Sequence, residues 1–230
     1  MKIRHCAVLL ALISLTAIPA AQASGGGTAS GGAAAPTQSP TLTPDEIAIT
    51  NYNQGLGHRD KAWNLEKQLA TSSDTKQTAK LETKIQKEYK KAIRDFETAI
   101  ENRPGFYQAL SSLGYARRKT GDYEGSLGAY GMALRLAPDY MEAVEYRAEA
   151  YLALGRVDEA KDAYLKLFAR DREKADQLMA AMKGWLADQR SGSGEASPDE
   201  LAQMEEWIAG REEIAVQTAK LSMRENGRSW

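Results

Sequence analysis

The chain has little of what most catalytic and metal centres are built from. Among its 230 residues there are one cysteine and two histidines. Cys6 and His5 both lie in the first few residues, so the remainder of the chain carries His58 alone. A single histidine without a thiol cannot form a structural zinc site or a Cys–His nucleophile pair. No glycine-rich phosphate loop follows a strand-like segment. We therefore expect no enzyme activity, no cofactor and no metal site.

Excess charge of one sign is also lacking. The formal net charge is −1, charged residues make up 27% and aromatic residues 7% of the chain. This balance gives no reason to expect a nucleic-acid partner. Glycine and proline are concentrated near the N-terminus, and the remainder is rich in helix-forming residues. The length allows one domain with a sizeable core, so the composition favours a helical protein.

The N-terminal segment has the layout of a secretory signal peptide. A short basic start, Lys2 and Arg4, precedes an apolar run from Cys6 to Ile18 and a small-residue site at Ala21-Gln22-Ala23. The run is short for a membrane span, so we expect cleavage after Ala23; an uncleaved anchor is the alternative. Residues 24–42, rich in Gly, Ala, Ser and Pro, are expected to be a flexible linker. The predicted location is periplasmic or secreted.

A period of 34 residues runs through the middle of the chain. Aromatic residues, small residues, turn glycines and prolines all recur at this spacing. The sets are Phe96/Tyr130/Tyr164, Ala99/Ala133/Leu167, Ala92/Ser126/Ala160, Gly121/Gly155 and Pro104/Pro138. Several independent sets at one spacing indicate a repeat protein.

Each repeat reads as a helical hairpin. Gly121 and Gly155 separate two helical segments and supply the left-handed conformation that ends a helix. Gly114 is small where two helices must approach each other closely, and Tyr130 is large enough to fill the space between successive hairpins. Pro138 ends the second helix, because proline cannot continue it. One hairpin cannot bury its apolar face alone, so the repeats must stack.

These residues carry a family resemblance. Leu113-Gly114, Gly121-Asp122-Tyr123, Ser126, Tyr130, Ala133 and Pro138 resemble one tetratricopeptide (TPR) unit, and Tyr151, Gly155, Ala160 and Tyr164 resemble a second. The segments Leu113–Tyr123 and Glu145–Arg156 also resemble small exported bacterial TPR proteins without an assigned activity, and the resemblance covers about Tyr89 to Ala181. The resemblance implies an all-α fold of TPR hairpins stacked as a short right-handed α-solenoid, with an elongated first hairpin and extra C-terminal helices.

The expected organisation follows from the helix start signals. Capping boxes begin at Thr43 and Ser197, each followed by proline at the first helical position. We expect a TPR domain over 43–189, made of a long hairpin (43–105), repeats at 107–140 and 141–172, and a covering helix at 172–189. A hinge (190–197) and a C-terminal helix and tail (198–230) follow. The C-terminal helix is acidic, and we expect it to dock either on the stack or on a partner. On the stack, one candidate surface is the basic face of the first hairpin at residues 76–94.

The family resemblance implies that the first helix of each hairpin lines a concave groove. The candidate partner-binding residues are Gln108, Ser111, Tyr115, Arg118, Lys119, Glu142, Glu145 and Glu149. A groove that is basic and aromatic beside acidic residues suits an extended peptide of mixed charge. The alternative is an internal set of salt bridges, from Arg118 to Glu145 or Glu149, without a ligand.

A second candidate surface is a basic stripe on the first hairpin. Basic residues recur there every three or four positions, at Lys76, Lys80, Lys84, Lys87, Lys91 and Arg94. The stripe is either an ordinary solvated face or a surface for anionic lipid headgroups or an acidic partner. Two functions therefore remain open: an exported scaffold or adaptor that holds a protein or peptide in the groove, and a peripheral protein that contacts a membrane through the stripe.

Overall fold

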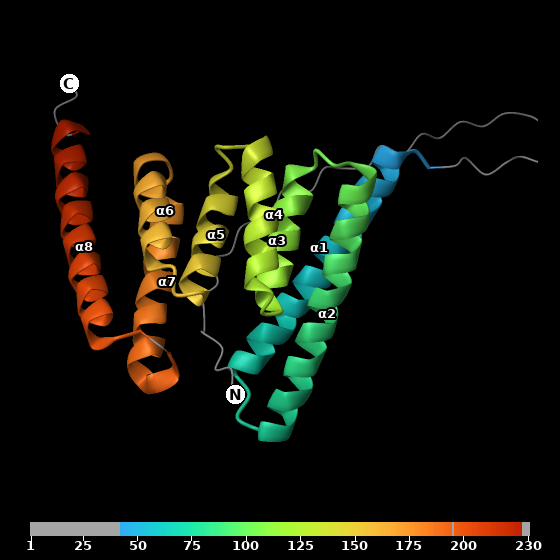
Figure 1. The fold of residues 1–230 in the computed structure, drawn as a ribbon, viewed down its shortest axis with the longest axis horizontal. Helices are drawn as coiled ribbons and strands as arrows, with labels where there is room; N and C mark the ends of the chain where they lie inside the picture. The colour runs from blue at the N-terminus through green and yellow to red at the C-terminus, as the bar shows by residue number, and fades with distance from the viewer. Residues whose placement is uncertain (1–41, 195, 227–230) are drawn as a thin grey trace, which may run out of the picture.

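The computed structural model describes residues 42–194 and 196–226. The expected signal peptide and nearly all of the expected linker lie outside the described residues. Within the described part the chain forms eight α-helices and no strand, which confirms the predicted all-α helical repeat solenoid. The helices stand side by side in a row, with the first hairpin at one end and the last helix at the other (Figure 1). No helix in these two ranges is long and apolar enough to cross a membrane.

The first hairpin is about twice as long as the others. It consists of α1 (Pro44–Ala70) and α2 (Thr75–Asn102). A complete capping box starts α1, because the Thr43 side chain accepts from the Glu46 amide while the Glu46 carboxylate accepts from the Thr43 amide. Helix α2 has a simpler N-cap, in which the Asp74 side chain accepts from the Lys76 and Gln77 amides. The far end of this hairpin projects beyond the shorter helices (Figure 1).

Two short hairpins follow. The first is α3 (Tyr107–Lys119) with α4 (Tyr123–Leu136), and the second is α5 (Met141–Ala153) with α6 (Val157–Arg170). Between the paired helices the backbone passes through the left-handed region at Gly121 (φ 86°) and Gly155 (φ 70°). Residues with a Cβ rarely adopt this conformation, which explains the glycine in each turn.

A buried aromatic ring anchors each hairpin. Phe96, Tyr130 and Tyr164 are 0%, 0% and 2% exposed. The first two rings lie directly against a glycine of the preceding helix: a Cβ built on Gly55 would be 2.5 Å from Phe96, and one built on Gly114 would be 2.7 Å from Tyr130. These distances are too short for a real Cβ. The glycines therefore let the rings pack against the helix backbone, as expected for Gly114.

Two further helices complete the stack. Helix α7 (Arg172–Asp188) packs on α5 and α6, and a π-helical turn at Gln189–Ser193 leads to α8 (Pro198–Asn226). Helix α8 buries Met204 and Ile208, and the Trp207 ring meets Tyr164 at 5.3 Å. The C-terminal helix therefore docks on the stack. It does so at the end opposite α2, so the basic stripe considered as its docking surface was the wrong candidate (Figure 1).

Candidate binding groove

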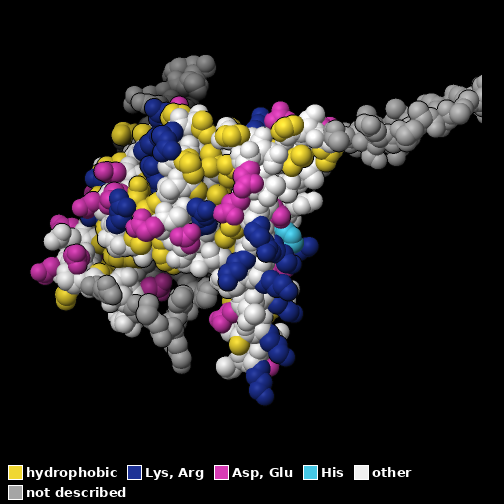
Figure 2. Space-filling view, turned by 45° about the vertical axis from the view of Figure 1, so that its right-hand side comes forward, with side chains coloured by type: hydrophobic (Ala, Val, Ile, Leu, Met, Phe, Trp, Pro, Cys, Tyr) yellow, Lys and Arg dark blue, Asp and Glu magenta, His cyan; other side chains and the backbone are white. Residues whose placement is uncertain are grey.

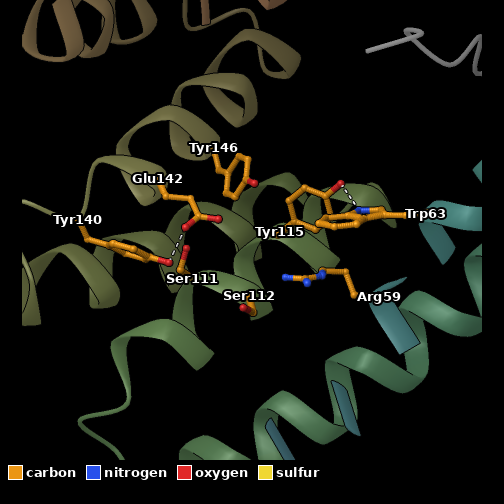
Figure 3. A pocket seen from close by; sticks show the side chains of 8 residues that line it. All are labelled: Arg59, Trp63, Ser111, Ser112, Tyr115, Tyr140, Glu142 and Tyr146. Carbon is orange, nitrogen blue, oxygen red and sulfur yellow. Dashed lines mark hydrogen bonds between the residues drawn. The ribbon is translucent and has the colours of Figure 1, made fainter. Parts of the chain in front are cut away.

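The first helices of the three hairpins meet at one small pocket. Helices α1, α3 and α5 all contribute, together with the residue before α5. The lining residues are Arg59, Trp63, Ser111, Ser112, Tyr115, Tyr140, Glu142 and Tyr146 (Figure 3). The space for the centre of a water molecule is about 10 Å³. That is room for about one water molecule, so the pocket is far too small for a small-molecule ligand and admits only the tip of a partner's side chain.

Aromatic rings connect the three hairpins along this groove. The Trp63 indole meets Tyr115 edge-on with ring centres 5.8 Å apart, and its Nε1–H donates to the Tyr115 hydroxyl at 2.7 Å. The Tyr115 ring in turn meets Tyr146 at 5.1 Å. All three side chains are half-buried. Each ring is held by its neighbour, so the groove presents a rigid aromatic surface with polar edges.

Most charges on the groove side are paired within the molecule. Arg118 donates to Glu149 in an ion pair whose side chains are 14% and 11% exposed. Burial alone disfavours the charge, but the Glu149 carboxylate raises the pKa of Arg118. Lys119 pairs with Glu66 of α1 at 2.8 Å. Of the two internal salt bridges considered from the sequence, the one between Arg118 and Glu149 is therefore present.

Glu145 does not belong to the groove surface. Its residue is 3% exposed, and its nearest cation is Lys174 of α7 at 3.9 Å. Burial, followed by the negative charge of Glu149, raises the pKa of Glu145. The expectation that Glu145 faces a partner is corrected: α7 packs against this side of α5 and covers it.

Glu142 differs from the other groove carboxylates. It has no ion pair among the residues that the structure describes, and it accepts the Tyr140 hydroxyl at 2.7 Å. Burial, with a further contribution from the Glu142 charge, raises the pKa of Tyr140, so the hydroxyl remains a donor. Arg59 lies in the same pocket, where its guanidinium stacks 4.2 Å from the Trp63 ring and bonds to Asp60 at 2.9 Å.

Three predicted residues line the pocket, namely Ser111, Tyr115 and Glu142. Gln108 lies on α3, like Ser111 and Tyr115, but outside the pocket. Sequence reasoning missed Arg59, Trp63, Ser112, Tyr140 and Tyr146. Tyr146 follows Glu142 by four residues, so helical spacing alone would have found it. Arg59 follows Gly55 by four residues, as Arg118 follows Gly114, so the repeat register would have found it. Trp63 gave no such signal, because it lies eight residues after Gly55 and the short helix α3 ends five residues after Gly114.

The basic stripe is exposed over most of its length. Lys76, Lys80, Lys84, Lys87 and Arg94 are exposed, and none has an ion pair within the described part of the chain. Lys91 is the exception, since it pairs with Glu88 at 2.6 Å. Figure 2 shows basic side chains running down the projecting part of the long hairpin.

His58 is a structural residue of the long hairpin. Its Nδ1 lies 2.6 Å from Glu88 of α2, and its Nε2 lies 3.7 Å from Asp95. The side chain is 24% exposed. His58 therefore links α1 to α2. Within the described ranges no group of three His, Cys, Asp or Glu side chains could hold a metal ion.

The geometry defines a class: a stack of helical hairpins whose first helices share one pocket. Residues 86–140 and 113–176 each match the sequence model of the tetratricopeptide repeat. Residues 86–176 of the chain are thus tetratricopeptide repeats. Repeats of this family are generally protein–protein interaction modules and typically non-catalytic. No curated protein matches the chain.

Proposed function

We propose that this protein is a non-catalytic scaffold or adaptor of the bacterial envelope, which holds an extended segment of a partner protein in the groove of α1, α3 and α5. The observation that carries the proposal is the row of half-buried aromatic rings across three hairpins, Trp63, Tyr115 and Tyr146. Aromatic residues dominate the binding energy of protein interfaces because they bury much area at a low entropic cost. The general role of the repeat family supports the same reading.

Trp63→Ala should reduce partner capture about tenfold or more, because the indole forms one wall of the pocket and fixes Tyr115. The measurement compares how much of the same partner the immobilised variants and the parent protein recover from extracts of the native cells. Trp185→Ala is the matched control, since Trp185 is a half-buried tryptophan of α7 outside the groove. Equal losses for the two variants would mean that the effect comes from weakened packing and would remove the groove from the proposal.

A second candidate function rests on the exposed stripe. We propose that the stripe makes peripheral contact with anionic lipid headgroups. Its exposed basic side chains that have no ion pair in the described part of the chain support this proposal. A flexible row of lysines on a projecting edge matches a diffuse negative surface better than a shaped partner.

Changing Lys76, Lys80 and Lys84 together to glutamine tests this second function. At about 1 kcal/mol for each lysine near an anionic surface, binding to phosphatidylglycerol vesicles should fall roughly a hundredfold at low salt. High salt should release the parent protein in the same sedimentation assay. Equal binding of parent and variant, or salt-independent binding, would contradict contact through the stripe.

The proposed location outside the cytoplasm is tested separately. The basic start, apolar run and small-residue site of residues 1–23 support export with cleavage after Ala23. Mass spectrometry of the protein from its native cells should find Ser24 as the first residue, without acylation. A chain that still begins at Met1 would contradict the proposal.

A further inference from the structure

One carboxylate of the groove has no ionic partner among the residues that the structure describes. Among the predicted groove residues, Arg118, Lys119, Glu145 and Glu149 all have an ionic partner inside the molecule. Glu142 has none within the described residues, although it lies in the same groove and lines the pocket. An ionised carboxylate without a cation, in a partly buried site, has electrostatic capacity for a positive charge from outside.

The surroundings of Glu142 fit a cationic side chain. The Tyr140 hydroxyl donates to Oε2 at 2.7 Å and fixes the carboxylate, which leaves its remaining acceptor positions open. Tyr146 lies one helical turn further along α5, and Figure 3 shows the carboxylate between the side chains of Tyr140 and Tyr146. A carboxylate beside aromatic rings binds ammonium and guanidinium groups through charge-assisted hydrogen bonds and cation–π contacts.

The arginine in the same pocket does not neutralise Glu142. The Arg59 guanidinium is held 4.2 Å from the Trp63 ring and bonds to Asp60 through Nε at 3.1 Å and through Nη2 at 2.9 Å. In Figure 3 it lies beside Trp63, on the other side of the pocket from Glu142. The pocket therefore has a positive and a negative side, with aromatic rings between them.

We propose that Glu142, with Tyr140 and Tyr146, forms a subsite for a lysine or arginine side chain of the segment bound in the groove. This inference rests on the proposed groove function and specifies the chemistry of its partner. The cation enters alongside the tyrosine rings and pairs with the Glu142 carboxylate, while the rest of the partner crosses the rings of Tyr115 and Trp63.

The test uses a random linear peptide library displayed on phage and the full chain as bait. Parent protein should select peptides in which one position is enriched in lysine or arginine. Glu142→Gln keeps the side-chain shape and still accepts the Tyr140 hydroxyl, so it should bind peptides without that enrichment. Glu206→Gln is the control, because Glu206 is an exposed carboxylate on α8, outside the groove; it should retain the enrichment.

Affinities of one selected peptide provide the second readout. Glu142→Gln should weaken its binding about tenfold, as expected for loss of a charge-assisted hydrogen bond. Replacing the enriched lysine of the peptide by norleucine should weaken its binding to the parent protein by the same factor. The same replacement should not further weaken its binding to Glu142→Gln.

The outcomes separate the subsite from the groove. Peptides that bind the parent but not Trp63→Ala, without a cationic preference, would overturn the subsite and leave the groove function standing. A cationic preference that survives Glu142→Gln would do the same. No selected peptide at all, or a set of peptides that Trp63→Ala binds equally well, would overturn both proposals.

Discussion

Tyr130→Ala should lower the free energy of unfolding by about 3–5 kcal/mol, the cost of removing a large aromatic side chain from a packed core. Tyr130 is 0% exposed, and its hairpin is packed between two others. Urea unfolding followed by circular dichroism measures the loss. Tyr123→Ala is the control, since Tyr123 lies half-buried at the start of the same helix and should lose clearly less. Equal losses would mean that the 34-residue aromatic position does not anchor the stack.

The contact between Tyr130 and Gly114 sharpens this prediction into a double-mutant cycle. Gly114→Ala places a Cβ 2.7 Å from the Tyr130 ring, which is fully buried, so we expect a loss of about 1–3 kcal/mol from overpacking. In the Tyr130→Ala background the same change extends into vacated space. There alanine's better helix propensity, worth about 1 kcal/mol, should make Gly114→Ala neutral or stabilising. The same sign in both backgrounds would contradict the packing described here.

The second large effect is expected at the ion pair of Arg118 and Glu149. Arg118→Met leaves the Glu149 carboxylate buried without its cation and should cost about 3–5 kcal/mol. Changing both residues, Arg118→Met with Glu149→Leu, removes both charges and should restore much of the lost stability. Urea unfolding of the parent, both single variants and the double variant measures the coupling.

This cycle also separates structure from binding. If Arg118 and Glu149 contact a partner directly, the double variant should fold well and fail to capture it. If their role is the internal pair alone, the double variant should retain capture. An additive result, in which the two single losses sum in the double variant, would contradict the pairing itself.

The repeat core was predictable from the sequence because its determinants are local and periodic. Phe96, Tyr130 and Tyr164 share one spacing, and Gly121 and Gly155 mark the two turns through a conformation that other residues avoid. These inferences need only the helix period and the geometry of one hairpin. The placement of Ser111, Tyr115 and Glu142 on helices that line the groove came instead from the family resemblance.

The charged residues were less predictable because their environment depends on neighbouring helices. Spacing alone places Glu142, Glu145 and Glu149 on one face of α5. Only the position of α7 decides that Glu145 is buried beside Lys174, while Glu142 stays unpaired. The part of α1 at the groove was missed for a similar reason, since Trp63 reaches Tyr115 only through the tertiary packing of the long hairpin.

The position of α8 shows that apolar burial outweighs surface charge in deciding where this helix docks. Its acidic composition favoured the basic stripe, but exposed ion pairs contribute at most about 1 kcal/mol each. Burial of Met204 and Ile208 against the end of the stack outweighs such pairs, at about 1.5–3 kcal/mol for each fully buried side chain. Counting charges therefore gave the wrong surface, and the apolar positions of the helix would have been the better guide.

The central claim, that the concave groove holds a protein partner, is tested most directly by photo-crosslinking in the native cells. A photoreactive amino acid at Gln108 lies on the groove helix α3 beside the pocket, whereas one at Leu165 lies exposed on α6, which contributes no residue to the pocket. The account predicts a discrete protein adduct from position 108 that is lost with Trp63→Ala, and no such adduct from position 165. The same adduct from both positions, or from position 165 alone, would contradict it.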